Sequence, residues 1–208
     1  MRSPPRSNVL RLAALLLASC AASCATRGRT DEVITHPAAP PIAPFTECTV
    51  YTAREASEAA NHVAVCSELA YDVPPTGGAH YSQWAAFGSY DAPVPWGFLV
   101  HAMEHGAIVL AYRCEPGPAC AAIRAELEAI VVAREPDPLC RGDARTRYVL
   151  APAPDLEWPI AVLAWEHLYT ATCLDRPSIE SFVDAHYGRG PESTCADGVD
   201  RSPLDWCP

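Results

Sequence analysis

Blocks of apolar residues predict a regular series of strands and helices from residue 106 onward. Residues 106–112 are apolar without interruption, which indicates a strand buried on both faces. Residues 119–134 repeat apolar side chains at the spacing of one helix face. Residues 147–151 and 159–165 predict two more strands, and residues 177–188 predict a second helix that starts at a proline. This order predicts an α+β fold: a mainly antiparallel sheet with helices packed on one face, of which a ferredoxin-like arrangement is one form.

The chain before residue 100 is less regular. Residues 53–60 favour a short helix by propensity, and residues 63–71 fit a strand or an irregular segment. Residues 74–80 form a loop whose prolines fix φ and whose paired glycines permit conformations that other residues avoid. Residues 86–97 are rich in turn formers, and the tail at 189–208 is irregular. The expected domain therefore has its regular core in its second half.

The first residues resemble an export signal. Three arginines precede an apolar segment at 12–18, which is shorter than the ~20 residues that cross a bilayer. The sequence Leu17-Ala18-Ser19-Cys20 resembles a bacterial lipobox, which predicts cleavage before Cys20 and lipidation of its thiol. An ordinary signal peptide cut near Ala22 or Ala25, or lipidation at Cys24, are the alternatives.

These features predict three parts: a signal peptide at 1–19, a proline-rich tether at 20–46 and a single domain at 47–208. Loss of residues 1–19 removes three arginines and no acid, so the formal net charge falls from −10 to about −13. Such a domain repels nucleic acid, and its membrane contact is expected through a lipid anchor only. The predicted location is the cell envelope, on the periplasmic or extracellular face.

The cysteines agree with export. Eight lie beyond the lipobox region, with no C-x-x-C pair, which favours up to four disulfides over a thiolate metal site. Proximity in sequence suggests four pairs: Cys195–Cys207, Cys48–Cys66, Cys114–Cys120 and Cys140–Cys173. The tail is then expected to be held by its own cysteines.

Titratable side chains gather beside the apolar strand. His101-x-x-Glu104-His105 matches the H-x-x-E-H pattern of inverted zincins, in which two histidines bind zinc and the Glu activates water. That pattern works on a long helix. Prolines and a glycine at 93–97 precede it and Gly106 follows it, so we expect at most one helical turn here. This context disfavours a peptidase.

A metal centre without peptidase activity remains open. His101 and His105 can converge on one ion, with His80 as a third imidazole and His62 as a fourth. Three histidines with an open position suit catalysis or transport, whereas four form a closed structural site. Two further histidines have contexts that favour structural roles, a strand end and a helix C-terminus: His167 and His186.

The neighbours of these histidines allow several roles. Glu104 could be a ligand, or an acceptor that orients a ring. Met103 could add a soft ligand that favours copper, although a methionine beside a strand is usually core. In a reading without metal, His101 bonds a backbone carbonyl and Glu104 pairs with Arg113 or Arg147.

Two motifs together resemble the DUF3105 family. One is the Pro-Pro-Thr-Gly-Gly-x-His loop at 74–80, and the other is Val-His-x-Met-Glu-His-Gly at 100–106. The resemblance extends over about residues 61–192. The family has no assigned reaction, but the resemblance implies that five residues form one recurring constellation: His62, His80, His101, Glu104 and His105. Glu166-His167 departs from the family pattern after Trp165, so no role is carried over there.

The sequence therefore predicts an exported, lipid-anchored domain that binds or handles copper or zinc. A metal-dependent hydrolase with Glu104 as general base is one alternative. A metal-free structural or interaction domain with a buried His/Glu network is another. No G-x-S-x-G elbow, phosphate loop or G-x-G-x-x-G motif suggests other chemistry.

Overall fold

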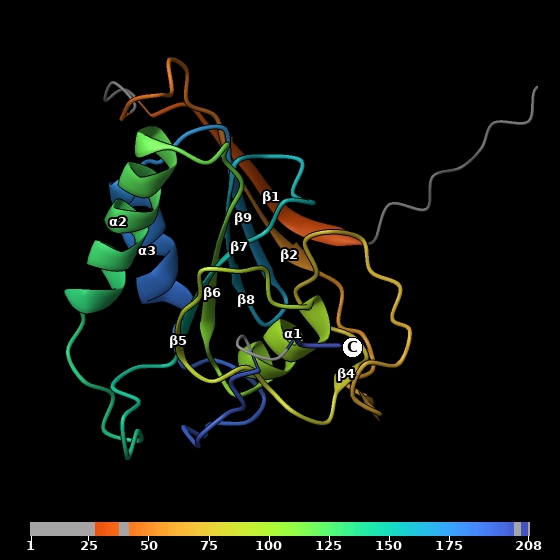
Figure 1. Cartoon of the computed structure of the whole chain (residues 1–208). Coiled ribbons are helices and arrows are strands. Elements are labelled where there is room, and N and C mark those ends of the chain that lie inside the picture. The colour runs from red at the N-terminus through yellow and green to blue at the C-terminus, as the bar shows by residue number, and fades with distance from the viewer. Residues whose placement is uncertain (1–27, 38–41, 202–204, 208) are drawn as a thin grey trace, which may run out of the picture.

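A computed structural model describes residues 28–37, 42–201 and 205–207 (Figure 1). Its strands form one seven-stranded mixed sheet, in the order β1-β2-β9-β8-β6-β7-β5, and a separate pair, β3-β4. The strands are β1 (Arg29–Thr35), β2 (Val50–Glu55), β3 (His62–Val63), β4 (His80–Tyr81), β5 (Gly88–Ser89), β6 (Ile108–Tyr112), β7 (Tyr148–Pro152), β8 (Ile160–Ala164) and β9 (His167–Ala171). The helices are α1 (Trp96–Glu104), α2 (Pro118–Val132) and α3 (Arg176–His186). The predicted α+β class with a mainly antiparallel sheet is confirmed.

The strand order explains the mixture of directions. Helix α2 connects β6 to β7, and these two strands pair in parallel, as a helical crossover requires. Strands β8, β9 and β2 continue the sheet in antiparallel fashion from the other side of β6. Because β6 and β7 pair directly, the sheet lacks the strand that a ferredoxin-like split βαβ unit places between them.

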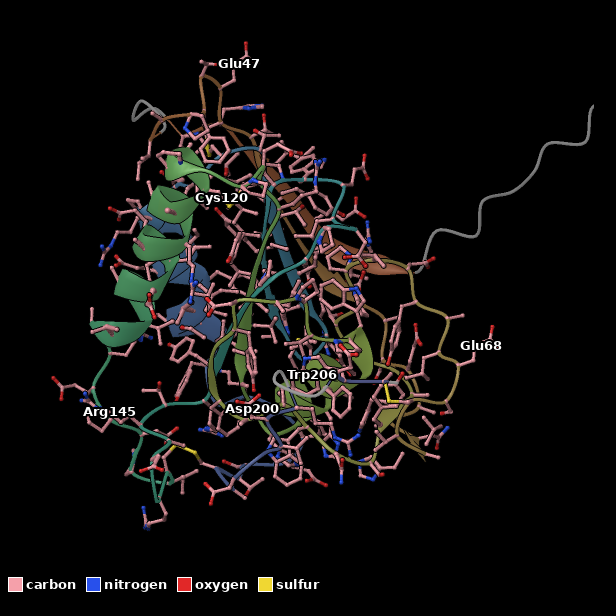
Figure 2. The ribbon with its side chains drawn as sticks, viewed as in Figure 1. Glu47, Glu68, Cys120, Arg145, Asp200 and Trp206 are labelled. Carbon is pink, nitrogen blue, oxygen red and sulfur yellow. A yellow bond between two sulfur atoms is a disulfide. The ribbon has the colours of Figure 1, made fainter. Side chains whose placement is uncertain are left out.

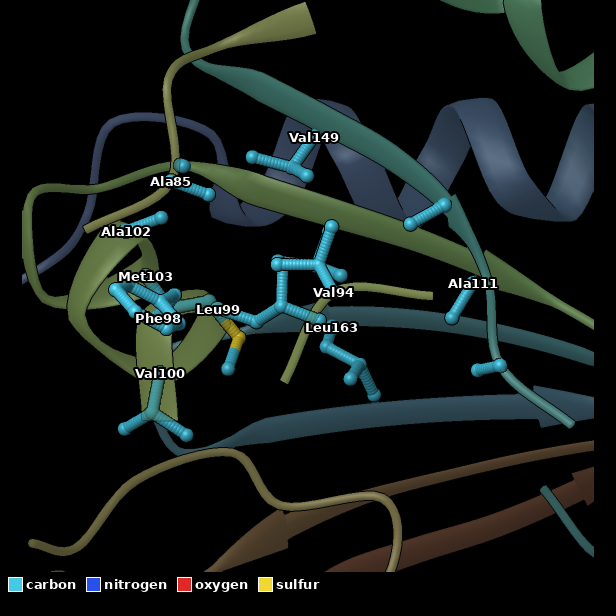
Figure 3. Packing of buried hydrophobic residues seen from close by; sticks show 14 of the residues in the cluster. Ala85, Val94, Phe98, Leu99, Val100, Ala102, Met103, Ala111, Val149 and Leu163 are labelled. Carbon is cyan, nitrogen blue, oxygen red and sulfur yellow. The ribbon is translucent and has the colours of Figure 1, made fainter. Parts of the chain in front are cut away.

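Both faces of the sheet are covered. Side chains alternate along β6, so Ile108 and Leu110 face one cluster and Val109 and Ala111 face the other. Helices α2 and α3 pack on the first face, as expected, and α1 lies against the opposite face (Figure 1). Figure 3 shows the α1 side, where fully buried residues of the helix meet the sheet. Burial on both faces accounts for the unbroken apolar run in β6.

Helix α1 corrects the expectation of at most one helical turn around His101, since it has nine residues. The prolines do not prevent it, because Pro95 occupies the N-cap position, where no intrahelical N–H is needed. Gly97 lies where a Cβ would come within 3.0 Å of the Tyr81 ring, so its small size serves packing. Gly106, at φ +82°, ends the helix in the left-handed conformation and lets β6 begin directly.

Sheet pairing also overrides local propensity near the N-terminus. The predicted helix at 53–60 is wrong, because residues 50–55 form β2 and hydrogen-bond to both β1 and β9. Residues 29–35, within the expected tether, form the exposed edge strand β1. The lipobox at Cys20 and the whole predicted signal peptide lie outside the described residues.

The described residues contain four disulfides (Figure 2), which indicates an oxidising, exported environment. The predicted pair Cys114–Cys120 is confirmed. The other three predicted pairs are wrong, and the observed pairs are Cys48–Cys173, Cys66–Cys207 and Cys140–Cys195. Pairing of β2 with β9 brings positions 48 and 173 together, and the tail crosses the molecule instead of folding on itself. None of the helices described here is long and apolar enough to cross a bilayer.

Candidate metal centre

His62 and His80 are neighbours across a short parallel ladder. The pairing of β3 with β4 places His62 directly beside His80, so their side chains leave the same face. Their ring centroids are 4.7 Å apart. The side chain of His80 is fully buried, whereas that of His62 is 47 % exposed. The His62–His80 pair therefore extends from the buried interior to the solvent-exposed surface.

The proline-glycine loop holds His80 in position. Thr76 donates its hydroxyl to the buried carboxylate of Glu55 at 2.5 Å, which fixes the loop to the end of β2. Gly78, at φ +94°, adopts a backbone conformation that other residues avoid. Its carbonyl oxygen lies 2.9 Å from Nδ1 of His80. A carbonyl only accepts, so this Nδ1 carries the proton.

Helix α1 and its C-cap residue, His105, supply the other three predicted residues. His101, Glu104 and His105 are at most 5 % exposed, and their i, i+3 and i, i+4 spacing puts them on one side of the helix. Nδ1 of His101 lies 2.6 Å from the carbonyl oxygen of Tyr81, the residue that follows His80 in β4. The helix and the ladder are thus joined by a ring-to-backbone hydrogen bond.

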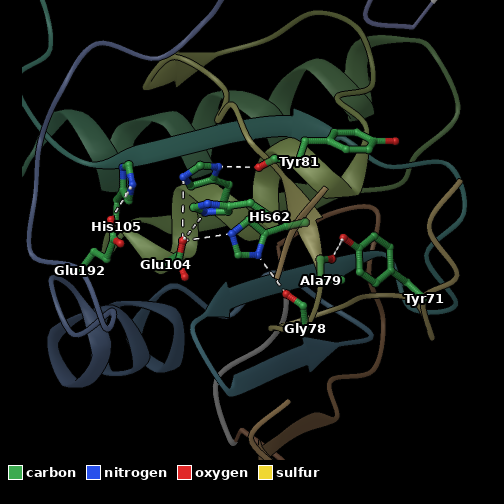
Figure 4. Close-up of polar contacts among 10 residues, drawn as sticks. His62, Tyr71, Gly78, Ala79, Tyr81, Glu104, His105 and Glu192 are labelled. Atoms are coloured by element: carbon green, nitrogen blue, oxygen red, sulfur yellow. Dashed lines mark hydrogen bonds and ion pairs between the residues drawn. The ribbon is translucent and has the colours of Figure 1, made fainter. Parts of the chain in front are cut away.

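Three imidazoles converge on Glu104 (Figure 4). Nε2 lies 3.0 Å from Glu104 Oε2 in His80, 3.2 Å in His62 and 3.8 Å in His101. One ligand atom from each of these four residues lies within 4.8 Å of the other three. Four donor atoms so close together could hold a metal ion.

The protonation of Nδ1 in His80 and His101 leaves Nε2 of each ring as a hydrogen-bond acceptor that faces another acceptor, the Glu104 carboxylate. Since His80 and His101 donate Nδ1–H to backbone carbonyls, their neutral forms point Nε2 lone pairs toward a carboxylate oxygen. Burial lowers the pKa of His101 to about 4, so this ring is neutral at neutral pH. Acceptors at this spacing repel unless a cation lies between them. One metal ion would satisfy them all, whereas imidazolium ions with centroids 4.6–4.8 Å apart would repel each other.

His105 belongs to an adjoining group. Its ring centroid is 4.7 Å from that of His101, but its Nε2 lies 3.2 Å from Oε2 of Glu192. Glu104, His105 and Glu192 form a second set of ligand atoms within 4.8 Å of one another. Burial lowers the pKa of His105, while the two carboxylates oppose the shift. Three of the four predicted imidazoles therefore meet at one point, and the fourth lies beside it.

Glu192 was not predicted from the sequence to lie among the possible metal ligands. It lies in the irregular tail, where only the proximity of His105 in space reveals it. The backbone N–H of Glu192 donates to the carbonyl of Glu104 at 2.9 Å, which places the tail along the end of α1. The sequence gives one weak signal, a carboxylate within the region that resembles the DUF3105 family.

The side chains considered for a metal-free reading have other contacts. Arg147 pairs with Asp137 at 2.8 Å, and Arg113 donates to the carbonyl of Glu157. Met103 is fully buried among apolar residues on the sheet side of α1 (Figure 3), which supports its reading as core. The backbone partner expected for His101 in that reading is present, but it occupies only Nδ1.

An indole ring borders both groups. The Trp84 ring lies 5.0 Å from His101 and 4.3 Å from His105, centroid to centroid. Its Nε1–H donates to the carbonyl of Ala196 in the tail. The aromatic wall limits access of water to the two buried rings, which strengthens electrostatic interactions inside the site.

The fold and the site define an exported-type, disulfide-stapled α+β domain with a His/Glu cluster that could hold metal. Comparison with protein families gives the relationship. The profile of the family described as "Protein of unknown function (DUF3105)" matches residues 62–198, more than half of the chain. The chain belongs to this family. A search of curated proteins and a search of solved structures each found no match.

Proposed function

We propose that this protein binds a divalent metal ion in the cell envelope through His62, His80, His101 and Glu104. The convergence of three imidazole Nε2 atoms on one carboxylate oxygen is the observation that carries the proposal. Backbone carbonyls hold the other nitrogen of two of these rings, as commonly seen for histidines that bind metals.

The donor set favours zinc or copper(II). It consists of three imidazole nitrogens and one carboxylate, which suits both ions. No soft sulfur donor reaches it within the described part of the chain, because Met103 packs in the core and the eight cysteines there are in disulfides. Copper(I), which prefers thiolates and thioethers, is therefore a poorer match.

Binding is better supported than hydrolysis. A general base stands beside a metal-bound water. Glu104 Oε2 lies 3.0–3.8 Å from the three imidazole Nε2 atoms, and this close grouping supports a role as a fellow ligand. The exposed side chain of His62 does leave one side of the centre open to solvent. A hydrolase with Glu104 as general base therefore remains the second candidate.

The envelope location has two supports. The four disulfides favour an oxidising compartment. The lipobox-like sequence before Cys20 suggests attachment through a lipid on that thiol. Mass spectrometry of the protein extracted from membranes, compared with a Cys20→Ser variant, tests the anchor: an unlipidated N-terminus in both would contradict it.

Elemental analysis of the purified, oxidised protein tests the metal site. We expect zinc or copper to co-purify, and His62→Ala and His101→Ala to lower the metal content at least tenfold. His167→Ala is the matched control, since His167 also donates Nδ1–H to a backbone carbonyl but lies on β9. Circular dichroism of each variant separates metal loss from unfolding.

The exposed position of His62 keeps the test informative, because its replacement removes a ligand with little loss of packing. If folded His62→Ala and His101→Ala variants retained the metal of the wild type, these residues would not be its ligands. A wild type that neither carries metal nor takes up added Zn²⁺ would instead support the buried polar network.

A further inference from the structure

The second ligand group shares a residue with the first. Glu104 belongs both to the set with His62, His80 and His101 and to the set with His105 and Glu192. Figure 4 shows Glu104 between the His105–Glu192 pair and the other imidazoles. A carboxylate has two oxygens and four lone-pair directions, so it can serve two cations at once.

The hydrogen bonding of the buried His105 ring is incomplete. Its side chain is 4 % exposed, and its Nδ1 atom is buried with no hydrogen-bond partner among the described residues. Buried polar atoms without partners are rare in folded proteins. Nε2 faces the Glu192 carboxylate at 3.2 Å. The ring is thus held at a carboxylate pair without a complete set of hydrogen bonds.

Backbone contacts of the tail hold Glu192 beside His105. Gly188 N–H donates to the carbonyl of Gly106, and Glu192 N–H donates to that of Glu104. A Cβ on Gly190 would lie within 3.0 Å of the backbone of Met103, Glu104 and Gly106, so only glycine permits this approach. The Cys140–Cys195 disulfide fixes the chain three residues after Glu192.

We infer that the site is a two-ion centre in which the carboxylate of Glu104 bridges the first ion to a second ion held by His105 and Glu192. The inference rests on the proposed function, since the first ion is the one proposed above. Carboxylates commonly bridge paired divalent ions about 3.5–4 Å apart. The side chain of Glu192 is 53 % exposed, so water can complete the coordination of the second ion.

The charges set a condition on this arrangement. The carboxylates of Glu104 and Glu192 balance the charge of one divalent ion, so a second ion requires further anionic ligands, such as hydroxide, at the exposed side of Glu192. The second position has fewer protein ligands, so we expect it to bind more weakly.

Titration of metal-free protein with Zn²⁺, followed by native mass spectrometry, tests the inference. We expect two ions per wild-type chain, and one ion per chain in Glu192→Gln and in His105→Ala. Glu115→Gln, which alters an exposed carboxylate before α2, is the control and should keep two. Glu192→Gln keeps the size of an exposed side chain, so it should not disturb folding.

Paramagnetic resonance of the Cu²⁺-loaded protein gives a second readout. Two copper ions joined by one carboxylate couple magnetically, so the integrated signal should fall below that of two isolated ions. Glu192→Gln should restore the signal of a single uncoupled ion. Two ions with uncoupled signals would overturn the bridge.

The outcomes separate the two proposals. A wild type that binds one Zn²⁺, with no change in Glu192→Gln, overturns the second position and leaves the first. A wild type that binds no Zn²⁺ overturns both. A second ion that survives both Glu192→Gln and His105→Ala lies elsewhere, and it too contradicts the inference.

Discussion

Nδ1 of His101 lies 2.6 Å from the carbonyl oxygen of Tyr81. This contact joins the motif helix to the strand that carries His80, and it decides which ring nitrogen of His101 faces Glu104. In the same way, the contact between Nδ1 of His80 and the carbonyl of Gly78 determines that Nε2 of His80 faces Glu104. Backbone carbonyls thus set the protonation pattern of the centre.

The first prediction concerns these tautomers. We expect metal-free protein at pH 7.5 to show His80 and His101 with Nδ1 protonated and Nε2 bare. Added Zn²⁺ should shift both Nε2 resonances in ¹⁵N NMR and leave Nδ1–H in place. His167, which has the same Nδ1 bond to Trp165, should not respond. Protonated Nε2 atoms in both rings would indicate a hydrogen-bonded network around Glu104.

The second prediction concerns the approach of the tail. Gly190→Ala should lower the free energy of unfolding by about 1–3 kcal/mol, because the new Cβ meets backbone that cannot move aside. It should also weaken uptake of a second Zn²⁺, since Glu192 moves with the tail. Gly28→Ala, where a Cβ meets only an ordinary contact at 3.7 Å, is the control. Equal denaturant midpoints for the two variants would contradict the close approach.

The third prediction concerns the buried ion pair behind His105. Arg147 pairs with Asp137 and donates Nη1–H to the carbonyl of His105 at 2.9 Å. Arg147→Met leaves the Asp137 carboxylate buried without its cation, so we expect a loss of about 3–5 kcal/mol. Arg176→Met breaks a half-exposed pair with Glu180 and should cost about 1 kcal/mol or less. Urea denaturation measures both.

The Arg147 experiment has an internal check. Addition of Asp137→Asn to Arg147→Met removes the stranded charge, so the double variant should be more stable than Arg147→Met alone. If both variants had the same stability, the cost would come from lost packing and not from an unpaired carboxylate.

The fourth prediction concerns pH, through a histidine outside the centre. Burial, with nearby His167 and Arg189, lowers the pKa of His186 to about 4. The unfolded chain takes up this proton near pH 6.5 and the folded chain only near 4, so the unfolded state binds more protons in between. The free energy of unfolding should therefore fall as pH drops from 6.5 to 4, by about 1–2 kcal/mol for this partly buried group.

Comparison with His186→Gln isolates that contribution. The variant should lose less stability than the wild type over the same pH range, in thermal or urea denaturation of metal-free protein. Parallel curves for the two proteins would show that His186 takes up its proton equally readily in both states.

The fifth prediction ranks two disulfides. Cys48–Cys173 joins residues 125 apart, whereas Cys114–Cys120 joins residues 6 apart. In the chain-entropy account, the longer loop restricts the unfolded chain more, so its removal should cost about 4–5 kcal/mol against about 2 kcal/mol. Paired Cys→Ala variants, compared in urea, check the order. A reversed order would mean that strain or residual structure dominates.

The sequence predicted the second half of the fold well, because its elements are marked by their own periodicity. The run at 106–112 and the apolar face of α2 are local signals that packing later reinforces. The helix predicted at 53–60 is wrong because residues 53–55 belong to β2, whose partners in β9 lie more than 100 residues away and whose other partners lie in β1. Local sequence does not encode such a partner.

The site residues also fall into those that the sequence predicted and those that it did not. Five residues were predicted as one constellation: His62, His80, His101, Glu104 and His105. The structure brings the first four together and places His105 in an adjoining group with Glu104 and Glu192. The helical context of His101 was missed, since prolines before a helix resemble a helix breaker until the N-cap position is known. The position of Glu192 and two disulfides, Cys66–Cys207 and Cys140–Cys195, depend on the path of an irregular tail, which has no periodic signal.

The uneven exposure of the three imidazoles bears on how an ion could arrive and depart. His80 and His101 are enclosed by protein, but about half of the His62 side chain meets solvent. An incoming donor molecule could therefore displace His62 first, while the enclosed rings keep hold of the ion. Such stepwise replacement would allow the proposed site to exchange its ion from the solvent side.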